Sequence, residues 1–178
     1  CRPVVHLSDK ARCAIIGQAP GRRVHDTGIP WNDPSGDRLR RWLALGDQPL
    51  HERRDLAIMP MGFCYPGKGS SGDLPPRREC APQWHQRCLE QMPEVALILL
   101  IGQYAQQSYL PASFLKAHPR LKDRVWHYEE VPAPFFPLPH PSPRNRRWFG
   151  QNPWFETEVI PALQQRLLDS GIAPHTPP

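Results

Sequence analysis

The sequence predicts an α/β fold, a three-layer α/β/α sandwich with a central, mostly parallel four-stranded sheet. Two observations predict it. Short, continuous apolar runs are typical of strands that are buried on both faces, as in parallel sheets. Helical patterns separate these runs, and such alternation implies right-handed crossovers that place helices on both faces of the sheet. The four runs are residues 13–16, 56–59, 95–101 and, more weakly, 135–138.

Apolar residues at helical spacing predict three helices. The first follows a capping candidate at Asp33 or Ser35. The last begins near Pro153, a residue that suits the first turn of a helix. The apolar positions are Leu39, Trp42 and Leu43 in the first helix, Ala81, Trp84 and Cys88 in the second, and Phe155, Val159, Leu163 and Leu167 in the third.

Length and charge limit the organisation and the partners. A chain of 178 residues with 39% hydrophobic content buries one sizeable core and is too short for a second full domain. We expect one domain over residues 1–172 and a disordered tail at residues 173–178. The formal net charge of +5 comes from an excess of arginine, whose planar fork suits phosphate. This charge favours an anionic partner such as nucleic acid.

Hydropathy and cysteine usage predict a cytoplasmic monomer with no membrane partner. The longest apolar run, residues 95–101, is far shorter than the roughly 20 residues of a membrane-spanning helix. We find no secretory signal. Five cysteines without such a signal indicate buried thiols or a metal site and argue against a disulfide framework.

Two loops that follow predicted strands carry the polar groups of a candidate site. GQAPG at residues 17–21 follows the first strand, and HPSPRN at residues 140–145 follows the last. In open parallel sheets, ligands bind outside the carboxyl ends of the strands. The glycines of the first loop let backbone N–H groups approach a ligand, although an ordinary strand-to-helix turn has the same composition. The second loop, which presents His, Ser, Arg and Asn between prolines, is the more specific signal.

These motifs resemble those of the uracil-DNA glycosylase superfamily. GQAPG, followed by TGIPW at residues 27–31 and NDPSG at residues 32–36, is similar to the first motif block of the bacterial and archaeal family 4 and family 5 enzymes. HPSPRN is similar to the second motif of the superfamily. The resemblance covers nearly the whole chain. It implies a DNA glycosylase of base excision repair that flips uracil or another deaminated base out of DNA and hydrolyses its N-glycosidic bond.

By this resemblance, Asp33 and His140 are the catalytic candidates. A carboxylate stabilises the positive charge that develops on the sugar and orients the attacking water, and Asp33 matches an Asp that family 5 enzymes carry in this run. A helix N-cap is the alternative role for Asp33, and Asp26 is the second candidate acid. His140 would donate a hydrogen bond to O2 of the leaving base. Other superfamily members have an Asp where this chain has Ala19.

The resemblance also assigns residues to base binding and DNA binding. Gly17, Gln18 and Ala19 would contact the base, and Trp31 would stack on it unless it packs in the core. Trp148 and Phe149 would act with nearby cations as a wedge that fills the vacated base stack, and the alternative is a solvated loop without a role. The expected DNA contacts are Ser142, Arg144, Asn145, Arg146 and Arg147.

Two departures from the family pattern concern a cofactor and specificity. Cys64 and Cys80 resemble one cysteine pair of the 4Fe-4S cluster of these enzymes, but a cluster needs four thiolates. We therefore expect either a structural cluster completed by two further cysteines upstream of Cys1, or a remnant of such a site. No cofactor is required for catalysis. Met59 or Pro60 stands where the family has an Asn that reads uracil, so deaminated purines become candidate substrates.

The sequence thus favours a monofunctional glycosylase, because neither motif holds a lysine that could form a Schiff base. The alternative is a catalytically weak or inactive member that binds damaged or single-stranded DNA. A hydrolase of free nucleotides or nucleosides on the same fold is a weaker third possibility.

Overall fold

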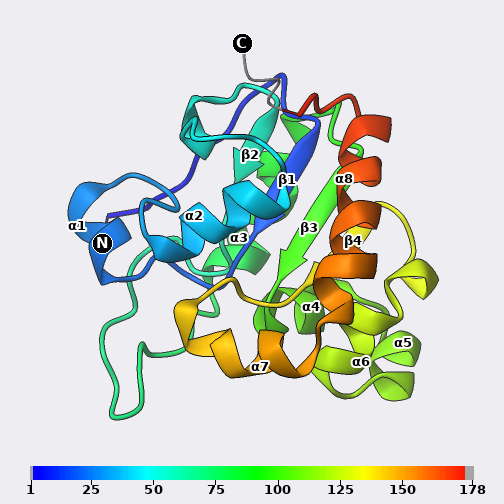
Figure 1. Ribbon diagram of the computed structural model, residues 1–178. Coiled ribbons are helices and arrows are strands. Elements are labelled where there is room, and N and C mark those ends of the chain that lie inside the picture. Colours follow the sequence, from blue (N-terminus) through cyan, green and yellow to red (C-terminus); the bar gives the residue numbers. More distant parts are fainter. Residues whose placement is uncertain (1, 175–178) are drawn as a thin grey trace.

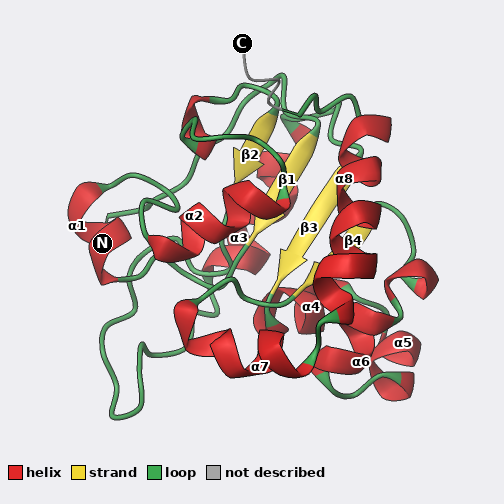
Figure 2. Ribbon diagram, in the orientation of Figure 1, coloured by secondary structure: helices red, strands yellow, loops and turns green. Residues whose placement is uncertain are grey.

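A computed structural model, which describes residues 2–174, places a parallel sheet at the centre of the molecule (Figure 2). Its four strands lie in the order β2–β1–β3–β4, and every neighbouring pair is parallel. Most of the predicted tail, residues 175–178, lies outside the described residues. The strands are β1 (Cys13–Ile16), β2 (Leu56–Ile58), β3 (Leu97–Ile101) and β4 (Phe135–Leu138). The predicted sheet is confirmed, with bounds within two residues of those expected.

Helices cover both faces of this sheet, which confirms the predicted three-layer sandwich (Figure 1). Helices α2 and α8 pack with one hydrophobic cluster, and α3, α4 and α5 pack with the cluster on the opposite face. No helix in the described part of the chain combines the length and apolarity needed to cross a membrane. The helices are α1 (Arg22–Thr27), α2 (Pro34–Trp42), α3 (Cys80–Glu90), α4 (Gln103–Tyr109), α5 (Ala112–Ala117), α6 (Leu121–Trp126), α7 (Arg146–Gln151) and α8 (Ile160–Asp169).

Strand β3 shows why the apolar runs are continuous. Leu97, Leu99 and Ile101 belong to the cluster under α2 and α8, whereas Ile98 and Leu100 belong to the cluster on the other face. Successive strand side chains point to opposite faces, so a strand covered on both sides needs an apolar residue at every position.

The topology determines where a ligand can bind. The chain passes from β1 to β2 on one side and then returns to place β3 on the other side of β1. This reversal leaves a crevice outside the carboxyl ends of the central strands, because the connections on the two sides diverge there. The loops that follow β1 and β4 therefore lie at the same end of the sheet.

Two of the three predicted helix stripes are confirmed. Helix α2 begins at the expected cap, Asp33. The last stripe is buried over its whole length, although its first part, Phe155–Val159, forms a π-helical turn that leads into α8.

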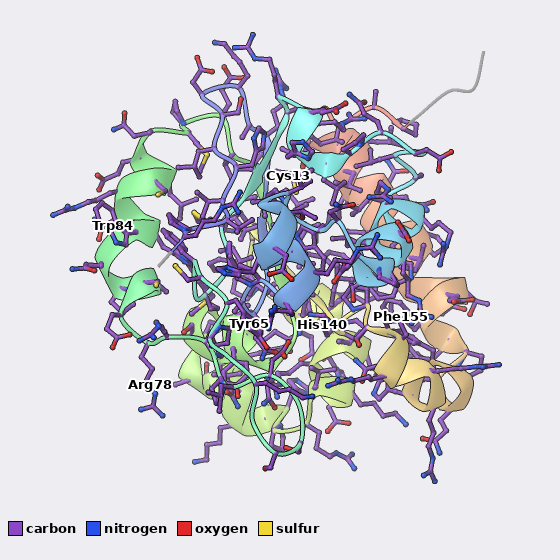
Figure 3. The ribbon with its side chains drawn as sticks, turned by 90° about the vertical axis from the view of Figure 1, so that its left-hand side faces the viewer. Cys13, Tyr65, Arg78, Trp84, His140 and Phe155 are labelled. Atoms are coloured by element: carbon purple, nitrogen blue, oxygen red, sulfur yellow. The ribbon has the colours of Figure 1, made fainter. Side chains whose placement is uncertain are left out.

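The predicted inward stripe of α3 is wrong in part. Trp84 is 45% exposed on the outer side of the helix (Figure 3), and His85 is the buried residue, only 3% exposed. A buried imidazole needs partners for both ring nitrogens. In His85 they are the carbonyl oxygen of Pro60, 3.0 Å from Nε2, and the hydroxyl of Tyr109, 2.6 Å from Nδ1.

Replacing Leu99 by Ala is expected to destabilise the fold by about 2–5 kcal/mol, because it leaves a cavity between the sheet and its helices. Leu99 is fully buried in β3. Leu168→Ala provides the control: Leu168 is 48% exposed on α8, and its replacement is expected to change the free energy of unfolding by less than about 0.5 kcal/mol. Denaturant unfolding measures both, and equal effects would contradict the burial described above.

Candidate active site

A cavity of about 420 Å³ lies at the carboxyl end of the sheet. This volume falls within the range of small-molecule sites. Its wall combines the loop after β1, the turn before α2, the exit of β2, part of the β2–α3 loop and the loop after β4. The lining residues include Gly17, Gln18, Ala19, Gly21, Trp31, Asp33, Ser35, Pro60, Pro66, Ser71, Gly72, Asp73, Leu74, His140, Ser142, Arg144 and Asn145.

The loop after β1 is fixed through its carbonyl groups. The carbonyl oxygen of Gly17 accepts a hydrogen bond from the backbone N–H of Met61 at 2.9 Å, and that of Gln18 accepts one from Gly62 at 3.0 Å. Within the described residues, the backbone N–H groups of Gln18 and Ala19 have no acceptor. Both residues line the cavity. The loop therefore retains two donors that a ligand can use.

Trp31 explains two glycines of the first motif block. Its backbone is left-handed, with φ of 57°. A Cβ on Gly17 would lie 3.0 Å from the indole atom Cζ2, and a Cβ on Gly36 would overlap the carbonyl oxygen of Trp31. Gly36 therefore excludes a larger residue, whereas a side chain at position 17 would require the indole to shift. The indole packs on the core cluster under α2 and also borders the cavity, so the expected core packing is confirmed and the stacking on a base stays a prediction.

Asp33 caps a helix and lines the cavity at the same time. Its Oδ1 accepts a hydrogen bond from the backbone N–H of Gly36 at 2.8 Å, the N-cap geometry of α2. No hydrogen bond to its other oxygen, Oδ2, is found within the described residues. Asp26, the second candidate acid, forms a surface ion pair with Arg22 at 3.1 Å and is not among the lining residues. Of the two acids, only Asp33 reaches the cavity.

His140 is held as a neutral hydrogen-bond donor. Its Nδ1 lies 3.2 Å from the backbone nitrogen of Ser142. That N–H can only donate, so Nδ1 accepts and Nε2 carries the proton. Burial lowers the pKa of His140 below its ordinary value, while the nearby charge of Asp33 acts in the opposite direction. The imidazole is therefore uncharged at neutral pH with Nε2–H as its donor.

The loop after β4 is supported by Asn145 and Arg38. Asn145 donates from Nδ2 to the carbonyl oxygen of His140 at 2.8 Å. Arg38 of α2 donates to the carbonyl oxygens of Pro141 and Ser142 at 3.4 and 3.3 Å, and its guanidinium lies over the ring of Phe149. Sequence reasoning missed Arg38. The motif HPSPRN could have indicated such a residue, because the backbone carbonyl groups next to its prolines need hydrogen-bond donors from elsewhere in the chain.

The predicted DNA-contacting residues divide into two groups. Ser142, Arg144 and Asn145 line the cavity, whereas Arg146 and Arg147 are exposed on α7 and are not among its lining residues.

The predicted aromatic wedge after HPSPRN is wrong. Phe149 packs edge-on against Trp42, with ring centroids 5.5 Å apart, and Trp148 packs in the same way on Phe155 at 5.8 Å. Both rings are half-buried against the core cluster. They are therefore not free to enter a base stack.

A segment that carries none of the predicted site residues contributes to the cavity wall. Residues 71–74, together with Pro66, line it from the β2–α3 loop. A glycine-rich stretch has no periodic pattern, and the one residue that could have marked it is Leu74, the only large apolar residue between Pro66 and Pro75.

The described residues do not fit an iron–sulfur cluster. Such a cluster needs four thiolates. Within residues 2–174, no group of three or more His, Cys, Asp or Glu side chains is placed to hold a metal ion. Cys64 is disulfide-bonded, and Cys80 is a half-buried thiol at the start of α3. The predicted cluster, which depended on cysteines upstream of Cys1, stays a prediction, and no step below uses it.

The fold and the cavity together define an α/β protein with a ligand site at the carboxyl ends of its parallel strands. They combine a parallel α/β/α sandwich, a cavity of about 420 Å³ at the carboxyl ends of its strands, Arg144 in the cavity wall and exposed arginines on the following helix α7. Comparison with known protein families identifies the class further: the family model of the uracil DNA glycosylase superfamily matches residues 5–164. The chain belongs to this superfamily, whose members generally hydrolyse N-glycosyl bonds in DNA. The resemblance in the sequence is thereby confirmed, and its narrower assignment to families 4 and 5 stays a prediction.

Replacing Gly36 by Ala is expected to destabilise the protein by roughly 1–3 kcal/mol, because the new Cβ displaces the carbonyl of Trp31. Gly150→Ala is the matched control, since a Cβ on Gly150 meets no atom within 4 Å. Denaturant unfolding compares the two. A Gly36→Ala variant as stable as the Gly150→Ala variant would contradict the close approach of Trp31.

The lowered pKa of His140 predicts a loss of stability in acid. As the pH falls through about 6.5, the ring binds a proton in the unfolded chain but not in the native state, so the free energy of unfolding decreases. A His140→Asn variant should lose less stability between pH 7.5 and 5.5 than the wild type does. Equal losses in both proteins, measured by denaturant unfolding, would show that His140 is not held neutral.

Proposed function

We propose that this chain is a monofunctional DNA glycosylase that hydrolyses the N-glycosidic bond of a deaminated base flipped out of DNA. The observation that carries the proposal is the convergence of a neutral His140 donor and the Asp33 carboxylate on one cavity of about 420 Å³. Membership of the superfamily supports the reaction class. DNA is the partner that suits Arg144 in the cavity wall and the exposed Arg146 and Arg147 on α7.

The proposed reaction separates charge, and the two residues stabilise the two developing charges. As the bond between the base nitrogen and C1′ breaks, its electron pair stays with the base. His140 donates a hydrogen bond from Nε2 to a base carbonyl oxygen, and the N–H groups of Gln18 and Ala19 provide further donors. The positive charge that develops on the sugar faces the carboxylate of Asp33. Oδ2 of this carboxylate orients a water molecule and accepts a proton from it as the water oxygen bonds to C1′. The departing base anion takes up a proton from solvent.

The absence of lysine from the cavity supports a monofunctional enzyme. A glycosylase that also cleaves the strand attacks the sugar with an amine and forms a Schiff base. No lysine occurs among the described residues that line the cavity. Water is therefore the proposed nucleophile, and the product is an intact strand with an abasic site.

Pro60 supports a base other than uracil as substrate. It lines the cavity at the exit of β2, and its carbonyl oxygen is held by the buried His85. A proline has no N–H donor and no polar side chain, so this wall presents an apolar surface to the base and does not read an amide edge. We include the deaminated purines hypoxanthine and xanthine among the proposed substrates for this reason.

A second function, damage-specific DNA binding without excision, has one observation in its favour. One oxygen of Asp33 is already used as a helix cap, and the first loop has Ala19 in place of a second acid. Salt-dependent binding to damaged DNA with no turnover of any base would select this alternative.

Excision from labelled oligonucleotides that carry uracil, hypoxanthine or xanthine tests the proposal. His140→Ala is expected to lower the rate of abasic-site formation about 10²- to 10³-fold, because it removes a donor to the leaving base. Asp33→Asn is expected to lower it about 10²-fold or more by removing the charge, while Asn still caps α2. Asp26→Asn, a change in an acid outside the cavity, serves as the control.

Rates that stay at the wild-type level in both His140→Ala and Asp33→Asn would remove these two residues from the mechanism. A wild-type protein that excises none of the bases but binds the damaged strands would instead establish the binding function.

A further inference from the structure

A protein that extrudes a base leaves a gap in the duplex, and an inserted apolar side chain commonly fills such a gap. This requirement rests on the proposed function. The side chain must be large, apolar, exposed and next to the cavity that receives the base. Trp148 and Phe149 do not meet these conditions because they pack on the core.

A search of the described residues leaves one candidate. The large apolar side chains that are well exposed are Leu7, Ile29, Leu74, Trp84, Trp126 and Leu168. Of these, Leu74 alone lines the cavity. It is 44% exposed.

Leu74 sits at the base of a small hairpin. Lys68 and Asp73 form an antiparallel bridge, Gly69 donates its N–H to Gly72 at 2.6 Å, and Leu74 donates its N–H to Gly67 at 2.9 Å. The segment between β2 and α3 extends as a loop away from the sheet at the lower left of Figure 1. The side chain of Leu74 lies across Gly67 and Gly69, since a Cβ on these glycines would meet it at 3.6 and 3.1 Å. The leucine therefore packs over the two glycines, and it is still 44% exposed.

The hairpin is tied to its own loop by Tyr65 and lies beside Arg144 of the loop after β4. Tyr65, which lies on the same side of the molecule as His140 (Figure 3), donates from its hydroxyl to Asp73 at 3.3 Å. Gly72 lies next to the guanidinium of Arg144, because a Cβ there would come within 2.8 Å of Nη1. Arg144 and Lys68 are exposed and provide cations beside Leu74. Such charges suit the phosphates on either side of an extruded nucleotide.

We propose that Leu74 is the wedge that enters duplex DNA and fills the space of the extruded base. The β2–α3 hairpin then forms the second arm of the DNA interface, beside the loop at residues 140–145. The occupant of this surface is a DNA duplex with a gap in its stack.

Binding to two duplexes tests the wedge without requiring catalysis. One duplex carries a tetrahydrofuran abasic analogue, which is a permanent gap, and the other is intact. Fluorescence anisotropy is expected to show tighter binding of the wild type to the gapped duplex. Leu74→Ala should reduce this preference about tenfold, because the truncated side chain no longer buries apolar surface between bases. Binding to the intact duplex should change little.

Leu7→Ala is the matched control, because Leu7 has the same 44% exposure and is not among the residues that line the cavity. Leu74→Met, which preserves a long apolar side chain, should retain the preference. The melting temperature of each variant verifies folding. A Leu74→Ala variant that folds and keeps the full preference for the gapped duplex would overturn the proposal, as would a wild type without any preference.

Excision assays separate this proposal from the proposed function. If the protein is a glycosylase and Leu74 is the wedge, Leu74→Ala should slow excision from duplex DNA more than from single-stranded DNA, where no opposing stack needs to be opened. If the protein excises no base, the gapped-duplex experiment still measures the wedge. Equal slowing on both substrates would contradict the wedge and leave the glycosylase assignment intact.

Discussion

A parallel sheet must be covered on both faces, and this constraint determines most of the molecule. Strand β3 contributes alternate residues to two separate hydrophobic clusters, so helices have to pack on each side. The reversal of strand order at β1 then opens a crevice at the carboxyl ends of the strands. The loops that begin at Gly17 and His140 both enter this crevice. Covering both faces of the sheet with helices therefore brings the reactive groups of the two loops together at one end of the sheet.

Within the crevice, several residues combine a structural and a chemical role. Asp33 caps α2 with one oxygen, and its charge raises the pKa of His140, which burial lowers. Trp31 packs on the core and borders the cavity. This sharing pre-organises the site, because a residue fixed by helix capping or packing needs no rearrangement when the substrate enters. It also explains why neither role alone describes Asp33 or Trp31.

The sequence predicted the parts of the structure that depend on local patterns. Continuous apolar runs located the strands, and an Asp before a helical stripe located the cap of α2. It did not predict that His85 is buried instead of Trp84, because Pro60 and Tyr109, the hydrogen-bond partners of His85, come from distant segments. The aromatic packing of Phe149 and the position of Leu74 in the cavity wall were missed for the same reason. Glycine-rich loops and side-chain partners far apart in the chain carry no periodic signal.

The central claim of this account is that His140 presents Nε2–H from a neutral ring. Nitrogen NMR of the imidazole, with a His140→Asn variant to assign the signals, tests this most directly. The account predicts a protonated Nε2 and an unprotonated Nδ1 at neutral pH, with the change to imidazolium occurring below the ordinary pKa of histidine, about 6.5. A proton on Nδ1 in the neutral ring, or an imidazolium at pH 7, would contradict the account.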